Sequence, residues 1–350
     1  MFRIETSSCS YNLEFCHLQL NITSRCNMKC KHCRGSYEDP KDLSLEDINA
    51  VLDFCQDKIQ KDAAFLISGG EPLLHPKFKE IMHLLKDRGV KYVSITTNGS
   101  FLTNSILSFL DSLKFNQLRV SISLDGLNEC EVNEFRQCST AFKDAIRAIE
   151  AVAKYPRIIS IVRTTIQKKQ LKDVPELVDF VAKNKVNIFS ISSIIPSGRA
   201  REDKSLWFDP QSKKKLLELI EQLSLKYPKL IMDVNDPLRC LMKIKKEDSL
   251  KVFGGCIAGV GSFSVEPDGW LMPCPLMHNQ KILNVKGRTG QEIFEEYINN
   301  DIIHNLLDRK LEGKCGACKY KYACGGCRAR AEAVSGSYLG SDSDCFLSLF

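Results

Sequence analysis

Long hydrophobic runs are missing from this chain of 350 residues. No apolar stretch approaches the roughly 18 residues that a membrane-spanning helix requires. The first 15 residues, MFRIETSSCSYNLEF, lack the apolar core of a secretory signal peptide. We therefore expect a cytoplasmic protein without a membrane partner. Its length exceeds that of most single domains, which predicts a large catalytic domain with a smaller one appended.

A strong excess of one charge is also missing. The chain has 49 Lys and Arg residues against 43 Asp and Glu residues, and the formal net charge of +6 is spread along its length. Short lysine clusters at 167–172, 212–215 and 243–246 are most simply solvated helix and loop faces, so we do not expect a nucleic-acid partner. A mild basic excess permits an acidic substrate or peptide and demands neither.

Cysteine, in contrast, is abundant, with 16 residues. A reducing cytoplasm argues against a disulfide framework, so ligation of a metal or cluster is the better account. Cys26, Cys30 and Cys33 form a triplet without a fourth cysteine nearby. Structural zinc is closed by four ligands, whereas a site that performs chemistry keeps one position open. The triplet therefore predicts a site with a free coordination position.

Strand-like runs alternate with helix-period segments six times along the first 200 residues. The predicted strands are 15–21, 63–68, 91–97, 118–124, 158–165 and 187–194. Helices are predicted at 43–59, capped by Ser44 with Asp47 three residues on, and at 76–89, from Pro76 to Gly89. This alternation predicts an α/β fold with a parallel sheet and right-handed crossovers. Because six units are fewer than the eight of a closed barrel, we expect a partial (β/α)6 barrel with its site at the carboxyl ends of the strands.

Four short motifs follow the first four predicted strands. The cysteine triplet follows the first, SGGEP (68–72) the second, TTNG (96–99) the third and SLDG (123–126) the fourth. Each motif alone is typical of a turn. Because the ends of parallel strands meet at one edge, their joint placement predicts a common pocket.

The pairing of CxxxCxxC after the first strand with GGEP after the second resembles the radical S-adenosylmethionine (SAM) superfamily. The resemblance implies that Cys26, Cys30 and Cys33 bind three irons of a [4Fe–4S] cluster and that SAM chelates the fourth iron, which accounts for the open position. It also implies a low-potential electron donor such as flavodoxin or ferredoxin, and a 5′-deoxyadenosyl radical that abstracts a substrate hydrogen. A zinc site is the alternative for the triplet.

The same resemblance implies a set of SAM contacts. They are His32 beside the adenine, Gly69 and Gly70 at the methionine moiety, Glu71 at its ammonium group, Asn98 in the same pocket, Ser123 and Asp125 at the ribose, and Arg136 near the carboxylate. A charge-assisted hydrogen bond suits the role of Glu71. For Arg136 the alternative is a surface ion pair with Glu131 or Glu134.

The last hundred residues resemble the SPASM extension, which carries auxiliary iron–sulfur clusters. The resemblance assigns Cys315, Cys318, Cys324 and Cys345 to one cluster and Cys256, Cys274 and Cys327 to another. The second set lacks a fourth thiolate: either Cys240 supplies it, or one iron stays open, which we favour. A double zinc ribbon is the alternative, because paired C-x₂-C motifs also fit zinc.

These motifs predict four segments: an N-terminal extension (1–14), the radical SAM core (15–206), a bridging helix and linker (207–250) and the SPASM domain (251–350). The resemblance implies a peptide or protein substrate first, since this is the commonest task of SPASM enzymes. A porphyrin modified in haem biosynthesis is the alternative, suggested by CGGCRARAEAVSG (324–336). Pro275 stands where sulfatase-maturing relatives have an aspartate, which disfavours that role. A non-enzymatic zinc protein is the hypothesis from another class.

Overall fold

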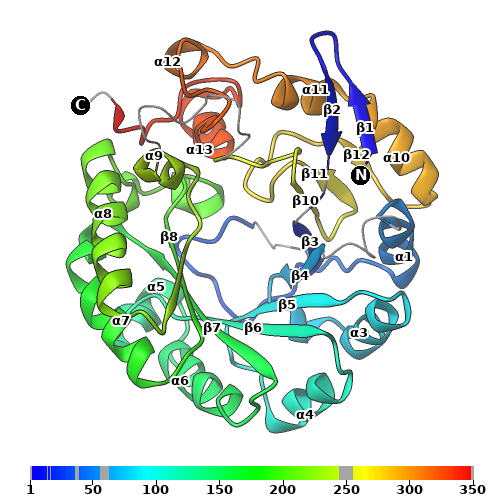
Figure 1. Cartoon of the computed structure of the whole chain (residues 1–350). Coiled ribbons are helices and arrows are strands. Elements are labelled where there is room, and N and C mark those ends of the chain that lie inside the picture. The colour runs from blue at the N-terminus through cyan, green and yellow to red at the C-terminus, as the bar shows by residue number, and fades with distance from the viewer. Residues whose placement is uncertain are drawn as a thin grey trace.

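The computed structural model describes residues 2–13, 15, 17–35, 39–55, 63–243 and 255–347. Its main sheet has the strand order β12-β11-β10-β3-β4-β5-β6-β7-β8-β9 and curves into an open barrel (Figure 1). The six predicted strands are all present and parallel: β3 (His17–Thr23), β4 (Ala64–Gly69), β5 (Tyr92–Thr97), β6 (Gln117–Ser123), β7 (Ile158–Ile166) and β8 (Ile188–Ser193). The α/β partial barrel predicted from the sequence is therefore confirmed.

Further strands extend the sheet at both edges. Strand β9 (Ile231–Val234) continues the parallel order beyond β8, and β10 (Ser262–Val265) pairs in parallel with β3. Strands β11 (Trp270–Met272) and β12 (Leu283–Asn284) then run antiparallel. The sequence did not predict these strands because each has only two to four residues. Through β10, the C-terminal part of the chain shares one sheet with the barrel.

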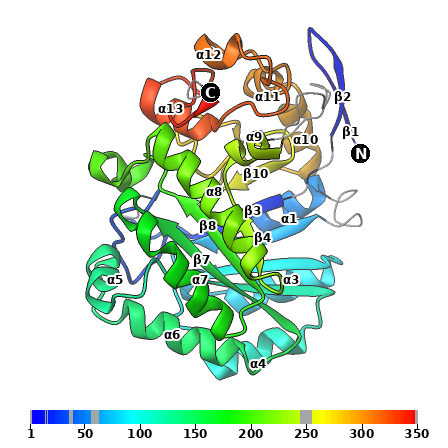
Figure 2. The same ribbon diagram turned by 60° about the vertical axis from the view of Figure 1, so that its left-hand side comes forward.

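Helices cover the outer face of the barrel (Figures 1 and 2). They are α1 (Leu45–Phe54), α3 (Phe78–Asp87), α4 (Asn104–Ser112), α5 (Glu129–Arg136), α6 (Ala141–Val152), α7 (Val174–Lys183) and α8 (Pro210–Lys226). The Ser44 side chain caps α1 by accepting from the Asp47 N–H at 3.0 Å, as predicted. Helix α1 ends at Phe54, and 56–62 lie outside the described residues. Helix α3 begins two residues after Pro76 and stops at Gly89, which has a φ of 76°.

The strands have an apolar outer face and a polar inner face. Leu20, Ile67, Ile95, Val120 and Val162 are fully buried beneath the helices. Since side chains alternate along a strand, the intervening residues point into the barrel, and many of them are polar. These inward-pointing polar residues include Asn21, Ser68, Thr96, Ser121, Arg163 and Asp233. A barrel interior of this kind is suited to a polar ligand.

The C-terminal region consists of short elements joined by loops and lies above the barrel in Figure 1. Its helices are α9 (Cys240–Lys243), α10 (Gly290–Ile298), α11 (Asp301–Leu307), α12 (Gly313–Gly316) and α13 (Arg328–Ser335). A hairpin of β1 (Phe2–Glu5) and β2 (Ser10–Leu13) packs against it, and the Tyr11 hydroxyl donates to Asp308 at 3.1 Å.

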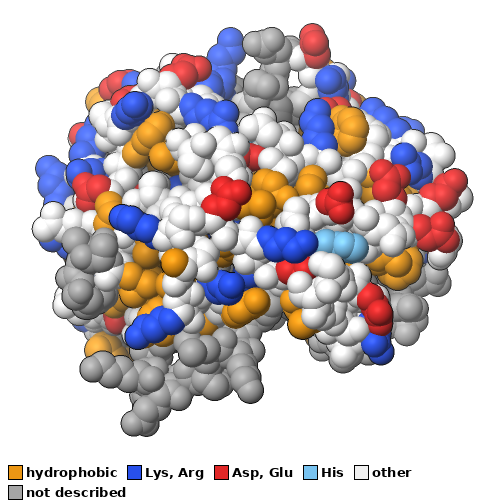
Figure 3. All heavy atoms as spheres, turned by 90° about the horizontal axis from the view of Figure 1, so that it is seen from above, with side chains coloured by type: hydrophobic (Ala, Val, Ile, Leu, Met, Phe, Trp, Pro, Cys, Tyr) orange, Lys and Arg blue, Asp and Glu red, His pale blue; other side chains and the backbone are white. Residues whose placement is uncertain are grey.

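Within the described ranges, no helix is both long and apolar enough to span a bilayer. On the face seen in Figure 3, basic and acidic side chains of described residues are interspersed.

Candidate active site

The loop that follows β3 carries the cysteine triplet across the mouth of the barrel. At its start, the Glu71 N–H donates to the Arg25 carbonyl at 2.7 Å, which ties the loop to the end of β4. At its far side, the Arg199 N–H donates to the Cys33 carbonyl at 3.0 Å, just after β8. The loop is therefore anchored to strands on opposite sides of the barrel, and Figure 1 shows it crossing the opening.

The three thiols of this loop lie together in apolar surroundings. Burial raises the pKa of Cys26 to about 11 and that of Cys30 to about 12, and each interacts electrostatically with Cys33. Met28 and Val132 pack around them. Cysteine thiolates are the usual ligands of iron–sulfur clusters, and binding of a cluster would release the protons of these thiols. Among the described residues, no three His, Cys, Asp or Glu side chains are arranged to hold a single metal ion.

Glu71 occupies the centre of the predicted pocket and is fully buried. Its carboxylate accepts from the Thr97 hydroxyl at 2.8 Å, from the Asn98 N–H at 2.8 Å and from the Leu73 N–H at 3.3 Å. Burial nevertheless raises the pKa of Glu71 to about 7. A carboxylate has about four acceptor positions, so one remains for the ammonium group that the resemblance places here.

The glycines of GGEP have a structural role that the sequence did not indicate. A Cβ on Gly69 would lie 2.3 Å from the Thr23 carbonyl oxygen, and one on Gly70 would lie 2.3 Å from that of Arg25. Such distances are too short for any side chain. These glycines therefore let the end of β4 approach the cysteine loop, and their contact with SAM remains a prediction.

Asp125 and Arg136 form a buried ion pair, with Arg136 Nη2 donating to Asp125 Oδ2 at 2.6 Å. The other Asp125 oxygen accepts from the Thr165 N–H at 2.9 Å. The alternative of a surface pair between Arg136 and Glu131 or Glu134 is wrong, because Arg136 is only 4% exposed and Glu134 pairs with Lys31 instead. Arg136 also interacts electrostatically with Cys30, so the pair borders the cysteine loop.

His32 links the cysteine loop to Asp125. Its ring stacks on Phe135 with the ring centroids 4.7 Å apart, and its Nε2 lies 3.9 Å from Asp125 Oδ2. Burial lowers the pKa of His32 to about 4, so the imidazole is neutral near pH 7. A neutral, stacked ring is suited to packing against the adenine that the resemblance places beside it.

The remaining predicted contacts lie at the same edge. The Asn98 amide donates to Asn27 of the cysteine loop at 2.8 Å. Ser123 ends β6 on the inner face, and its strand partner is Arg163. The structure thus brings every residue of the predicted SAM set to one edge of the barrel.

Sequence reasoning missed Gly198, which begins a short turn after β8. A Cβ on Gly198 would lie 2.4 Å from the carbonyl oxygens of both Cys33 and Arg34, and its φ of 56° favours glycine. The motif PSGRA (196–200) follows the end of a predicted strand, as the other four motifs do, and could have indicated this position.

Each C-terminal cysteine of the predicted clusters lies near others of the group to which the resemblance assigns it, and their ligation of clusters remains a prediction. Cys318 and Cys345 each interact electrostatically with Cys315 and Cys324. Cys274 and Cys327 each interact with Cys256. Cys240 forms a thiol hydrogen bond with Cys324, which places it beside the first of these groups.

The surroundings of these thiols fit negatively charged clusters. Backbone N–H groups donate to Cys315, Cys318, Cys324 and Cys327 sulfurs at 3.3–3.4 Å. Three arginines around them are at most 1% exposed: Arg309, Arg328 and Arg330. Arg328 Nη2 lies 3.6 Å from the Cys315 sulfur. Such hydrogen bonds and cations are the usual surroundings of thiolate-bound iron–sulfur clusters.

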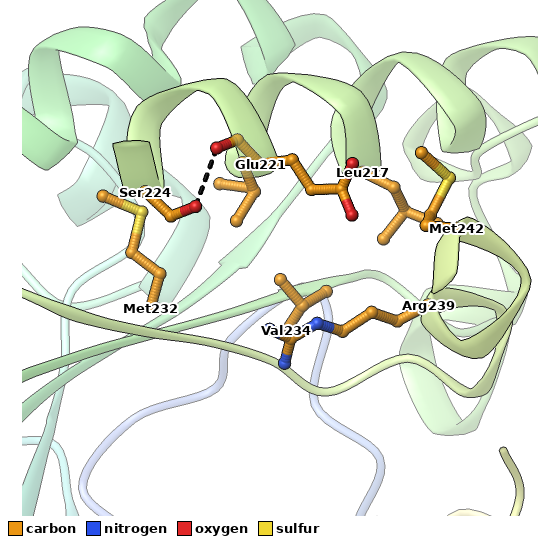
Figure 4. A pocket seen from close by; sticks show the side chains of 8 residues that line it. Leu217, Glu221, Ser224, Met232, Val234, Arg239 and Met242 are labelled. Atoms are coloured by element: carbon orange, nitrogen blue, oxygen red, sulfur yellow. Dashed lines mark hydrogen bonds between the residues drawn. The ribbon is translucent and has the colours of Figure 1, made fainter. Parts of the chain in front are cut away.

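A small pocket elsewhere takes no part in this site. It lies between α8 and β9 on the outer side of the sheet, and Leu217, Met232, Val234, Glu221 and Arg239 line it (Figure 4). Its 20 Å³ holds about one water molecule.

The fold and the site together are those of a radical SAM enzyme, and the family comparison finds this domain in the barrel segment of the chain. Residues 20–181 match the model of that family, described as the Radical SAM superfamily. The resemblance found in the sequence is thus confirmed, and the non-enzymatic hypothesis is wrong. The match to the radical SAM family implies SAM and a [4Fe–4S] cluster as cofactors.

Individual relatives cover nearly the whole chain. The AdoMet-dependent heme synthase of Methanosarcina barkeri is 28% identical, over 93% of this chain and 94% of its own. The subtilosin biosynthesis protein AlbA of Bacillus subtilis is 24% identical, over 89% of this chain and 66% of its own. The crystal structure of Streptococcus suis SuiB bound to precursor peptide SuiA is 19% identical and superimposes with a TM-score of 0.76, covering 95% of this chain and 76% of SuiB. This last likeness shows the fold alone.

Proposed function

We propose that this chain cleaves SAM reductively and abstracts a hydrogen atom from a side chain that bears a carboxylate. The propionate side chain of a porphyrin is our first candidate. One observation carries the proposal: the cysteine loop, the Glu71 carboxylate and the Asp125–Arg136 pair converge at one edge of the barrel. When bound, the cluster and SAM supply the 5′-deoxyadenosyl radical. The protein holds the cluster through Cys26, Cys30 and Cys33 and positions the C–H bond.

The porphyrin substrate is supported by the relatives and by the barrel interior. The heme synthase of Methanosarcina barkeri aligns over nearly the full length of both chains. Arg163 on the inner face supplies a cation for a carboxylate. Oxidative decarboxylation of a propionate to a vinyl group is the reaction that this combination favours. The 5′-deoxyadenosyl radical would take one hydrogen atom, carbon dioxide would leave, and the remaining electron would need an acceptor, for which an auxiliary cluster on the C-terminal cysteines is our candidate.

Modification of a peptide or protein side chain, the first expectation from the sequence, is the second candidate. AlbA acts, by its name, in the biosynthesis of a bacteriocin, and SuiB was crystallised with a precursor peptide. We put the porphyrin first because the tetrapyrrole relative has the higher identity and the more complete coverage.

The other components of the proposal follow from the sequence. One or two auxiliary clusters bind the C-terminal cysteines, and a flavodoxin or ferredoxin in the cytoplasm donates the electron. We keep the four segments 1–14, 15–206, 207–250 and 251–350 as the proposed domain division. Strand β10 belongs to the last segment but pairs with β3 of the barrel sheet.

Isotope transfer tests the function directly. Anaerobically reconstituted protein is incubated with SAM, dithionite and iron coproporphyrin III deuterated in its propionates. We expect deuterium in the released 5′-deoxyadenosine and loss of carbon dioxide from the porphyrin. Peptides encoded beside the gene, deuterated at their side chains, test the second candidate in parallel. Unlabelled 5′-deoxyadenosine with both substrates would overturn the proposal.

A further inference from the structure

Arg163 is placed inside the barrel by the alternation of strand β7. Its neighbours Val162 and Thr164 are fully buried on the outer face, so the Arg163 side chain lies on the inner one. In the sheet register it stands opposite Ser123 on β6 and Ser190 on β8. It keeps some accessible surface, which opens into the barrel.

The Arg163 guanidinium makes no hydrogen bond or ion pair within the described parts of the chain. Burial lowers the pKa of Arg163, yet a guanidinium stays charged in proteins. The carboxylates near it are engaged: Asp125 accepts from Arg136, and Asp233 accepts from the Ser190 hydroxyl at 3.2 Å. Because the half-buried guanidinium has no partner of its own there, its donors are available to an anion from outside the chain.

Two other arginines of the barrel mouth provide a contrast. Arg136 is held by Asp125 at 2.6 Å, and Arg34 donates to Glu266 at 3.2 Å and to the Pro275 carbonyl at 2.9 Å. Their partners lie within the chain, and both side chains fix the walls of the site. Arg163 interacts electrostatically with Arg34 and Asp125 and retains its donors for a ligand.

We infer that Arg163 binds a carboxylate of the substrate inside the barrel and thereby determines which substrate carbon reacts. A planar guanidinium binds a carboxylate through two parallel hydrogen bonds, which fixes the orientation of the ligand. Ser123, predicted at the ribose of SAM, is on the adjacent strand, about 4.8 Å away. The carbons next to the carboxylate are therefore held near Ser123. The inference rests on the proposed function and names the substrate group that the barrel recognises.

A labelling experiment tests carboxylate binding without knowledge of the substrate. Reconstituted protein with SAM is treated with phenylglyoxal, and modification of Arg163 is followed by mass spectrometry. We expect millimolar propionate or N-acetylglutamate to suppress labelling of Arg163 severalfold, and propionamide, which is uncharged, to leave it unchanged. Equal labelling with and without carboxylates, or no labelling of Arg163 at all, would overturn the inference.

Variants then connect the residue with a substrate. We expect Arg163→Gln to weaken binding of iron coproporphyrin III at least about tenfold in an absorbance titration, since a charge-assisted hydrogen bond is lost. The variant's affinity for SAM should stay within about twofold, and Arg163→Lys should recover part of the loss because it keeps the charge. The matched control is Arg119→Gln, on the inner face of β6 near its amino end, which should bind the porphyrin as the parent does.

The tetramethyl ester of the porphyrin distinguishes a failure of the Arg163 inference from a failure of the porphyrin proposal. If Arg163 binds a propionate, the ester binds the parent about as weakly as the acid binds Arg163→Gln. Equal binding of acid and ester to the parent would refute the role of Arg163 and leave the porphyrin proposal standing. If carboxylates protect Arg163 from labelling but the porphyrin does not bind, the porphyrin proposal is refuted. The carboxylate site at Arg163 then stands, with an acidic peptide as its ligand.

Discussion

The cysteine loop after β3 and the C-terminal cysteine groups hold thiols in opposite surroundings. In the loop, Met28 and Val132 pack around the sulfurs, and the nearby buried cation, Arg136, is already paired with Asp125. In the C-terminal region, three buried arginines surround the cysteines. The loop thus holds its thiols among apolar side chains, whereas backbone N–H groups and arginines border those of the C-terminal region, where Arg330 is itself paired with Asp236, Asp342 and Asp344.

Removal of one loop thiol should have the largest effect. We expect Cys30→Ala to abolish release of 5′-deoxyadenosine from SAM under dithionite, because an iron without its thiolate does not hold the cluster in reducible form. Cys138→Ala is the control, since Cys138 packs in the same apolar cluster outside the triplet. Undiminished turnover of Cys30→Ala would show that the loop does not bind the cluster.

The second prediction concerns the buried charges that join the two regions. Lys213 of α8 lies 2.6 Å from Asp236 and 3.6 Å from Asp344, and Arg330 of α13 lies 3.1 Å from Asp236. We expect Lys213→Met to lower the free energy of unfolding by about 3–5 kcal/mol, because it removes one of the two buried cations that face Asp236 and Asp344. Urea denaturation measures it against Lys214→Met, whose side chain pairs with Glu218 near the surface. Equal stabilities would mean that the network is not needed to join the regions.

The third prediction tests the ligand position beside the loop. Glu71→Ala should weaken SAM binding by about 1.5–3 kcal/mol, since a buried, charge-assisted hydrogen bond to the ammonium group is lost. Calorimetry with the reconstituted protein measures the dissociation constant, and Glu80→Ala, on the exposed side of α3, is the control. An unchanged constant would remove Glu71 from the SAM site.

A pH titration sharpens the same point. Burial raises the pKa of Glu71 from its usual 4.5 to about 7, so the neutral carboxyl predominates below about pH 7 in the folded protein. Its contribution to stability is complete below pH 4.5 and is lost as the pH rises through 7. The ammonium group of SAM requires the ionised form. We therefore expect SAM affinity to rise with pH up to about 7 and then level off, and Glu71→Gln to remove this slope. A parent profile that is flat between pH 5 and 8 would contradict the assignment.

The smallest effect is expected at the edge of the C-terminal groups. Cys240 contacts Cys324, which already belongs to a complete set of four cysteines. We expect Cys240→Ala to keep the iron content and absorption spectrum of the parent, whereas Cys324→Ala should lose about four irons. Loss of a cluster from Cys240→Ala would show that this thiol is a ligand.

The six central strands and the edge that carries the site could be predicted because each strand is long, apolar and followed by a recognisable motif. Strands β9 to β12 could not, since two to four residues give too short a pattern. The Asp125–Arg136 pair could not be predicted either, because the partners are 11 positions apart and the residues between them do not indicate the turn that brings them together. The packing role of Gly69 and Gly70 could not be predicted for a related reason: the backbone that crowds them, at Thr23 and Arg25, is distant in sequence.

The pairing of β10 with β3 has a consequence for any attempt to divide the protein. Strand β3 lies inside the sheet only because β10 covers one side of it, from His17 to Leu20. A chain shortened to the barrel segment would present the unpaired backbone groups of β3 as a new edge, and such edges pair with other chains. The strand that leads into the cysteine loop would then be the place where the shortened protein aggregates.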